Sequence, residues 1–242
     1  MVKTTDTIEL EGLDDSSFWE LFIACVFDDG VSESEKVLLE IGKEIVKKLK
    51  GSPLAAKTVG RLLRNHLDAG HWKRVLHSKE WELQTGDHDI MPTLKLSYDY
   101  LPFHLQQCFS YCSLFPEDYK FDRKELIHWW IGLDILHSDG QNKSIEDIGP
   151  SYLKLVDHGF FKEDEIYGSP CYIIHDLLHD LGLKVSSREC LSIDHANVGT
   201  VEIWPSIRHL SIIIDGVDNS DEVTAINFTS ELRIILKKKI ED

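Results

Sequence analysis

The sequence predicts a mainly α-helical protein: a four-helix bundle, then a second group of helices with a small β-hairpin, then a short β-rich tail. Two observations carry this prediction. Apolar residues recur at helical spacing over most of the first 190 residues, behind residues that typically cap helices. Alternation typical of strands is confined to a hairpin pattern at 165–174 and to segments beyond residue 189.

Composition indicates a globular protein with an acidic surface. The chain has 242 residues, of which 42% are hydrophobic and 10% aromatic, and its formal net charge is −16. This charge opposes binding to nucleic acid and to anionic lipid. The dense basic run at Lys237–Lys239 is more typical of a solvated terminus than of a binding site.

Targeting and redox signals favour a cytoplasmic protein, with the nucleus as the other option. The N-terminus lacks the apolar core of a signal peptide, and no run approaches the roughly 20 apolar residues that a membrane span needs. The five cysteines form no CxxC pair and lie among apolar residues. We therefore expect small, reduced core cysteines and no association with a membrane.

Residues 1–86 are predicted to form the four-helix bundle. Asp14 or Asp15 caps the first helix, and Ser32 with Glu35 forms a capping box before the second. Two apolar stripes follow these caps, the first made by Leu13, Phe18, Leu21, Phe22 and Val26, and the second by Val37, Leu38, Ile41, Ile45 and Leu49. The segment from His71 to Leu83 is expected to be the last helix of the bundle.

A helix-to-helix corner at GSPLA joins the second and third helices of this bundle. Gly51 ends one helix, Ser52 caps the next, and Pro53 occupies its first position, where a missing N–H costs nothing. The third helix buries apolar side chains, namely Leu54, Val59, Leu62 and Leu63.

Residues 87–190 are predicted to be a winged-helix domain. Pro102 opens a helix with a buried face, and FPEDYKF at 115–121 is a turn before a helix at 123–132. Ser144 and Asp147 cap a helix that runs to about Phe160. A hairpin around Gly168 to Pro170 and a helix at 176–187 complete the unit. Helices followed by such a wing are typical of winged-helix proteins.

Residues 191–242 are predicted to be a linker and the first strands of a leucine-rich repeat. Segments 191–194, 207–214 and 232–236 look like short strands. Apolar side chains alternate in the second of them, at Leu210, Ile212 and Ile214. Because roughly three repeats are needed to bury a solenoid core, this tail is interpreted as the edge of an array.

Three motifs, taken together, carry a resemblance. GSPLA at 51–55, CFSYCSLFPEDY at 108–119 and YIIHDLLHDLG at 172–182 occur in this order, and they resemble the C-terminal part of the nucleotide-binding module (NB-ARC) of plant disease-resistance proteins of the coiled-coil class. The resemblance covers about residues 5–190. It departs where Ser52 replaces leucine, at GLDIL (132–136), and where Ile174 replaces methionine.

The resemblance implies a nucleotide switch in the complete family protein. Pro53 is expected to pack against the adenine nucleotide and His175 to contact the diphosphate of ADP. A helix start favours an anion, and its histidine can bond a phosphate oxygen. Structural or switch roles are expected for Gly51, Leu54, Ile174 and Asp176. Exchange of ADP for ATP would release an oligomerising state that signals defence, including the hypersensitive response.

Several parts of such a module are missing from the sequence. The phosphate-binding pattern G-x-x-x-x-G-K-[ST] is absent, since Gly42-Lys43 is followed by Glu44 inside a helical pattern. No strand ends in paired aspartates that could hold Mg²⁺. We therefore expect ADP or ATP to bind only with the missing N-terminal nucleotide-binding subdomain, no metal in this chain, and no enzymatic activity of its own. The missing subdomain and C-terminal leucine-rich repeats are the expected partners, and the chain is a fragment, a truncated product or a degenerate relative.

Other interpretations stay open. Taken alone, GSPLA is an ordinary helix corner and His175 a surface histidine. A DNA-binding winged helix would use the segment Arg123–Trp130 as the helix that recognises DNA bases. A metal-dependent phosphohydrolase of the His-Asp type would use His175 and His179, one helical turn apart, with Asp194 and His195 as the nearest further ligands.

Overall fold

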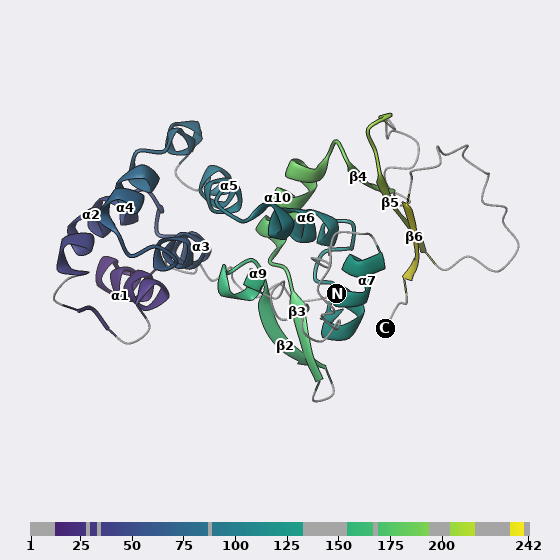
Figure 1. Ribbon diagram of the computed structural model, residues 1–242, viewed down its shortest axis with the longest axis horizontal. Helices are drawn as coiled ribbons and strands as arrows, with labels where there is room; N and C mark the ends of the chain where they lie inside the picture. Colours follow the sequence, from purple (N-terminus) through teal and green to yellow (C-terminus); the bar gives the residue numbers. More distant parts are fainter. Residues whose placement is uncertain are drawn as a thin grey trace, which may run out of the picture. The chain divides into compact units, whose positions relative to one another are not determined.

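The computed structural model describes residues 13–27, 30–32, 35–86, 89–132, 154–166, 169–193, 204–215 and 233–239. These residues form a mainly helical protein with a few short strands, as predicted (Figure 1). The chain divides into two compact units, 1–100 and 101–242. In the part of the chain that is described, no helix is long and apolar enough to cross a membrane.

The first unit is a helical bundle with one continuous core. Its helices are α1 (Asp15–Val26), α2 (Lys36–Val46), α3 (Pro53–Arg64), α4 (Ala69–Leu76) and α5 (Met91–Asp99), with a 3-10 helix at Lys79–Leu83. Helix α3 packs against both α1 and α5, and α2 packs against α4. The core includes Phe22, Ile45, Leu63 and Trp72, each with no exposed area.

Helix starts in this unit follow the predicted capping chemistry. Asp14 caps α1, with its carboxylate accepting from the backbone N–H groups of Ser16 and Ser17, both at 3.0 Å. Ser32 donates its N–H to the Glu35 carboxylate at 2.7 Å, which is one half of the expected capping box. The first helix therefore begins as predicted, whereas α2 begins at Lys36 with Glu35 at its N-cap and without a side-chain capping bond, so Ser32 is not its cap.

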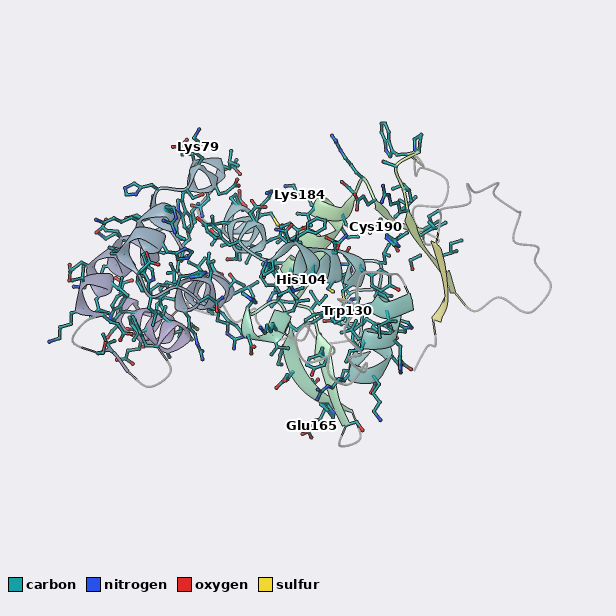
Figure 2. All side chains as sticks on the ribbon, viewed as in Figure 1. Lys79, His104, Trp130, Glu165, Lys184 and Cys190 are labelled. Carbon is teal, nitrogen blue, oxygen red and sulfur yellow. The ribbon has the colours of Figure 1, made fainter. Side chains whose placement is uncertain are left out.

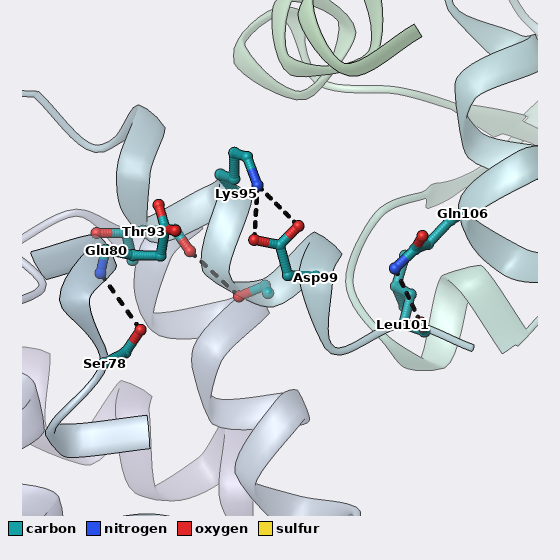
Figure 3. Close-up of polar contacts among 8 residues, drawn as sticks. Ser78, Glu80, Thr93, Lys95, Asp99, Leu101 and Gln106 are labelled. Atoms are coloured by element: carbon teal, nitrogen blue, oxygen red, sulfur yellow. Dashed lines mark hydrogen bonds and ion pairs between the residues drawn. The ribbon is translucent and has the colours of Figure 1, made fainter. Parts of the chain in front are cut away.

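Three details of the bundle differ from the prediction. Val37 is predicted to lie in the buried stripe of α2 but is 66% exposed, because it lies in the first turn at the edge of the face that buries Leu38 and Ile45. The segment 71–83 is two helices, because Ser78 caps a separate 3-10 helix by accepting from Glu80 N–H (Figure 3). Helix α5 groups with the first unit, although the sequence placed it in the second.

Polar bonds support helix α5 both near its buried start and along its exposed face. The Lys95 ammonium contacts both carboxylate oxygens of Asp99, at 2.8 and 2.6 Å (Figure 3). At its start, Gln84 donates to Thr93 Oγ1 at 2.8 Å. The finer three-part division of the chain, with boundaries at 86 and 190, stays a prediction.

The second unit contains the winged-helix fold. Its helices are α6 (Phe103–Cys112), α7 (Arg123–Gly132), α9 (Lys154–Asp157) and α10 (Asp176–Ser186). The wing is an antiparallel hairpin of β2 (Lys162–Ile166) and β3 (Ser169–Ile173), visible as paired arrows in Figure 1. The hairpin is as predicted, but Ser169 and Pro170 lie in β3 rather than in the turn. Ser144, Asp147 and Gly168 lie outside the described residues.

A third strand of the wing was not predicted. The two-residue strand β1 (Phe121–Asp122) pairs with β3, so the sheet order is β1-β3-β2. The expected turn before it is present, with Tyr119 donating to the Pro116 carbonyl at 3.3 Å and Asp118 at a φ of 57°. The turn therefore ends in a strand that fixes the start of α7 against the wing.

The core of this unit is rich in aromatic side chains. Trp130, labelled in Figure 2, has no exposed area, and Phe115 packs between the rings of Tyr111, Tyr119, Phe121 and Trp129. All five cysteines are free thiols, as expected. Burial raises the pKa of the Cys108 thiol well above its ordinary value and that of Cys190 to about 12, so both are protonated at neutral pH.

The tail forms a three-stranded parallel sheet within the second unit. Its strands are β4 (Cys190–Ile193), β5 (His209–Asp215) and β6 (Arg233–Lys239), in the order β4-β5-β6. The three predicted strands are thus present, and parallel pairing requires the long connections between them. Two details differ: Leu210 and Ser211 are both buried, so burial does not alternate there, and Lys237–Lys239 belong to β6 rather than to a free terminus.

Candidate functional site

The first candidate element is the start of α3 in the helical bundle. Gly51 has a φ of 68°, the left-handed conformation that ends the preceding turn. Ser52 caps α3, its Oγ accepting from Ala55 N–H at 3.3 Å, and Pro53 is the first helical residue. Pro53 is exposed and Leu54 is half-buried. This corner therefore presents a rigid apolar ring to solvent, on a helix anchored by the fully buried Ala55 and Ala56.

Close packing fixes the direction of α3. A Cβ at Gly60 would lie 2.7 Å from the Cβ of Cys25 in α1, so only glycine allows this approach. Thr58 is buried in α3, and its hydroxyl donates to the Leu54 carbonyl at 3.1 Å, so its own polar group is satisfied. The position of the Pro53 ring is thus set by the interior of the bundle.

The second candidate element is the start of α10 in the winged-helix unit. His175 is its cap, with Nδ1 accepting from Leu177 N–H at 3.3 Å and contacting Oδ1 of Asp176. Asp176 Oδ1 accepts from the same N–H at 2.7 Å. Both side chains are exposed, whereas Ile174 before them is 3% exposed. The helix begins at the predicted residue, with the isoleucine as its apolar anchor.

This arrangement suits an anionic ligand. The first N–H groups of a helix carry partial positive charge, and α10 spans 11 residues, long enough for that effect to matter. Asp176 neutralises part of this field, but it also bonds the backbone and so fixes the shape of the cap. With Nδ1 engaged locally, Nε2 of His175 is the ring nitrogen left to meet a ligand.

Helix α10 packs against α6, which carries the CFSYC segment. The Ser113 hydroxyl bonds to that of Ser186 at 3.2 Å, and Gly182 lies so close to Ser113 that an added Cβ would be 2.7 Å from the serine Cβ. His179 Nε2 is 2.6 Å from the Phe115 carbonyl. The CFSYCSLFPEDY and YIIHDLLHDLG motifs therefore pack against each other. The sequence does not show this contact, because the bonded residues Phe115 and His179 are 64 positions apart.

The proposed metal pairing of His175 with His179 does not form. His175 is an exposed cap, whereas His179 is 7% exposed and turned to a backbone carbonyl. Among the described residues, the one group of three possible ligands contains His179 but not His175. Asp194 and His195 lie outside the described residues. Gly42, part of the only Gly-Lys pair, lies buried inside α2.

Comparison with known proteins identifies the second unit. Residues 114–182 match the family described as "Disease resistance protein Winged helix domain". The chain carries the winged-helix domain of plant disease-resistance proteins. This match spans the FPEDY turn, the wing and the start of α10, so it includes the candidate residues at 174–176.

Relatives extend the similarity beyond the winged-helix domain. "Disease resistance protein RGA2" of Solanum bulbocastanum is 40% identical over 189 residues, which is 77% of this chain and 19% of the relative. "Disease resistance protein UNI" of Arabidopsis thaliana is 27% identical over 238 residues, 93% of this chain and 26% of the relative. The chain thus spans about a fifth of the length of the first of these relatives.

Proposed function

We propose that this chain is part of the nucleotide switch of a plant immune receptor and that it helps hold ADP in the resting state. The similarity to disease-resistance proteins supports an immune role. The observation that carries the nucleotide role is the start of α10, where an exposed histidine caps an 11-residue helix anchored by a buried isoleucine. Such a site is suited to a phosphate group.

In this proposal each of the two helix starts has its own role toward nucleotide. Pro53 offers a flat apolar ring for the adenine part, and His175 offers a donor for the diphosphate. We propose two partners. One is the nucleotide-binding subdomain that supplies the phosphate loop, and the other is a set of leucine-rich repeats that continues the β4-β5-β6 sheet. Exchange of ADP for ATP would move the winged-helix domain and permit oligomerisation, a two-state change biased by ligand contacts.

Charge on the wing opposes the DNA-binding alternative. Strand β2 carries Glu163, Asp164 and Glu165 in succession, in a chain of formal net charge −16. Lys120, which lies outside this strand, is already paired with Asp164 at 3.4 Å. The exposed face of α7 carries Glu125 beside the two cations Arg123 and Lys124, so this helix adds little positive charge for binding DNA. Nothing in the described residues favours DNA binding over nucleotide binding.

Asp176→Val tests the switch role in a complete receptor. We would exchange the matching segment of the Solanum relative for this chain and measure the ADP that remains bound after gel filtration. Loss of the Asp176 bond to the helix start should cost about 1 kcal/mol, a roughly fivefold loss of ADP retention. Glu163→Val on the wing is the control and should retain ADP normally. If Asp176→Val kept its ADP and the receptor stayed inactive, the switch role of Asp176 would be wrong.

A further inference from the structure

His179 is a buried imidazole with one nitrogen engaged and one without a partner. The side chain is 7% exposed, and Nε2 lies 2.6 Å from the Phe115 carbonyl oxygen, to which it donates. In that tautomer Nδ1 carries a lone pair. Nδ1 is buried and makes no hydrogen bond within the part of the chain that is described. A buried acceptor without a partner destabilises the folded chain, which points to a ligand that the protein chain does not itself supply.

Two carboxylates lie beside this ring. One ring nitrogen of His179, one oxygen of Glu117 and one of Asp180 all lie within 4.8 Å of one another. Glu117 sits in the tight turn closed by the Tyr119 to Pro116 bond, and Asp180 follows His179 in α10. Both carboxylates are exposed, and among the described residues neither has a lysine or arginine partner. Two uncompensated negative charges this close favour a cation between them.

We propose that Glu117, His179 and Asp180 bind a divalent transition-metal ion of the zinc class. One imidazole nitrogen and two carboxylate oxygens are a donor set that Zn²⁺ accepts, with water completing the coordination. Metal-binding histidines usually donate their other ring N–H to a carbonyl or carboxylate, as His179 does to Phe115. The imidazole disfavours Mg²⁺ and Ca²⁺, which prefer oxygen ligands alone.

The ion would join two segments that are distant in the sequence. It would connect the turn after α6 to residues 179 and 180 of α10. Helix α10 begins directly after His175, the proposed nucleotide contact. This site differs from the His175–His179 pair suggested by spacing alone, and it does not depend on nucleotide binding. Its expected effect is on the stability of the winged-helix unit, because bound metal stabilises the state that holds its ligands together.

Zinc titration of the full 242-residue chain tests this site. After dialysis against a chelator, calorimetry with ZnCl₂ should show one site, and Zn²⁺ should raise the thermal midpoint while Mg²⁺ does not. Glu117→Gln and Asp180→Asn should each weaken zinc affinity at least about tenfold. His179→Gln should do the same, because its amide N–H can still donate to Phe115 while the Nδ1 lone pair is lost.

Matched controls separate this site from adventitious binding to other side chains. Glu163→Gln removes an exposed carboxylate on the wing, and His128→Gln removes an exposed imidazole of α7. Both variants should bind zinc as the unmodified chain does. Equal zinc affinity in the unmodified chain and in Glu117→Gln and Asp180→Asn would overturn the proposal, and so would a loss of affinity shared by the controls. Neither result would bear on ADP binding.

Discussion

Replacing Trp130 by alanine is expected to lower the free energy of unfolding of the winged-helix unit by about 3–5 kcal/mol. The side chain has no exposed area and belongs to α7, which packs against β1 and β3 of the wing, so its removal leaves a cavity in a close-packed interior. Because small domains are stable by only about 5–15 kcal/mol, this loss is a large part of the total. Urea denaturation followed by near-ultraviolet circular dichroism measures it.

Trp204 provides the matched control for this change. It lies in the same unit but is 60% exposed, so its replacement by alanine removes the same atoms from a site that is already largely hydrated. We expect a change of at most about 0.5 kcal/mol there. Equal losses at the two positions would mean that Trp130 is not in the core of the unit.

Gly182→Val is expected to separate α10 from α6 and to cost about 1–3 kcal/mol. A Cβ at this position would lie 2.7 Å from the Cβ of Ser113, and valine adds two methyl groups beyond it. Gly132→Val in α7 is the control, because an added Cβ there meets nothing within 4 Å. Gly182 lies inside α10 and Gly132 at the end of α7, and replacing an interior glycine by valine favours the helix by a few tenths of a kcal/mol, so any net loss at Gly182 has a steric origin.

A second substitution tests the cause of that loss. Ser113→Gly removes the Cβ that collides, and it should restore part of the stability of Gly182→Val in a double-mutant cycle. Purely additive effects would show that the cost arises elsewhere than at this contact.

Local signals in the sequence predicted much of this fold. Asp14, Ser52 and Pro102 each precede a helix at the expected residue, and the hairpin and the helix from Asp176 are where the pattern placed them. Capping bonds span two or three residues, so the sequence displays both partners together. Gly51 takes the expected left-handed conformation, but it does not end the second helix as predicted, because α2 ends at Val46 and a turn connects the two.

Features that depend on tertiary packing were not predictable in this way. Val37 fits a helical stripe by spacing, but the packing of α2 covers Leu38 and Ile45 and leaves Val37, at the edge of that stripe, 66% exposed. Strand β1 exists because β3 pairs with it, and two residues carry no strand pattern of their own. The bond from His179 to Phe115 joins residues 64 apart, so the possible ligand group around it could not be seen from spacing. The nucleotide roles of Pro53 and His175 stay predictions.

Binding of ADP to the chimeric receptor described above, with and without His175→Ala, tests the central claim most directly. A hydrogen bond to a charged phosphate is worth about 1.5–3 kcal/mol, so the dissociation constant should rise about 10- to 150-fold. His128→Ala, which removes another exposed imidazole of the winged-helix domain, should leave it unchanged. An unchanged dissociation constant in His175→Ala would contradict the assignment of this histidine to the diphosphate, and with it the proposed nucleotide switch.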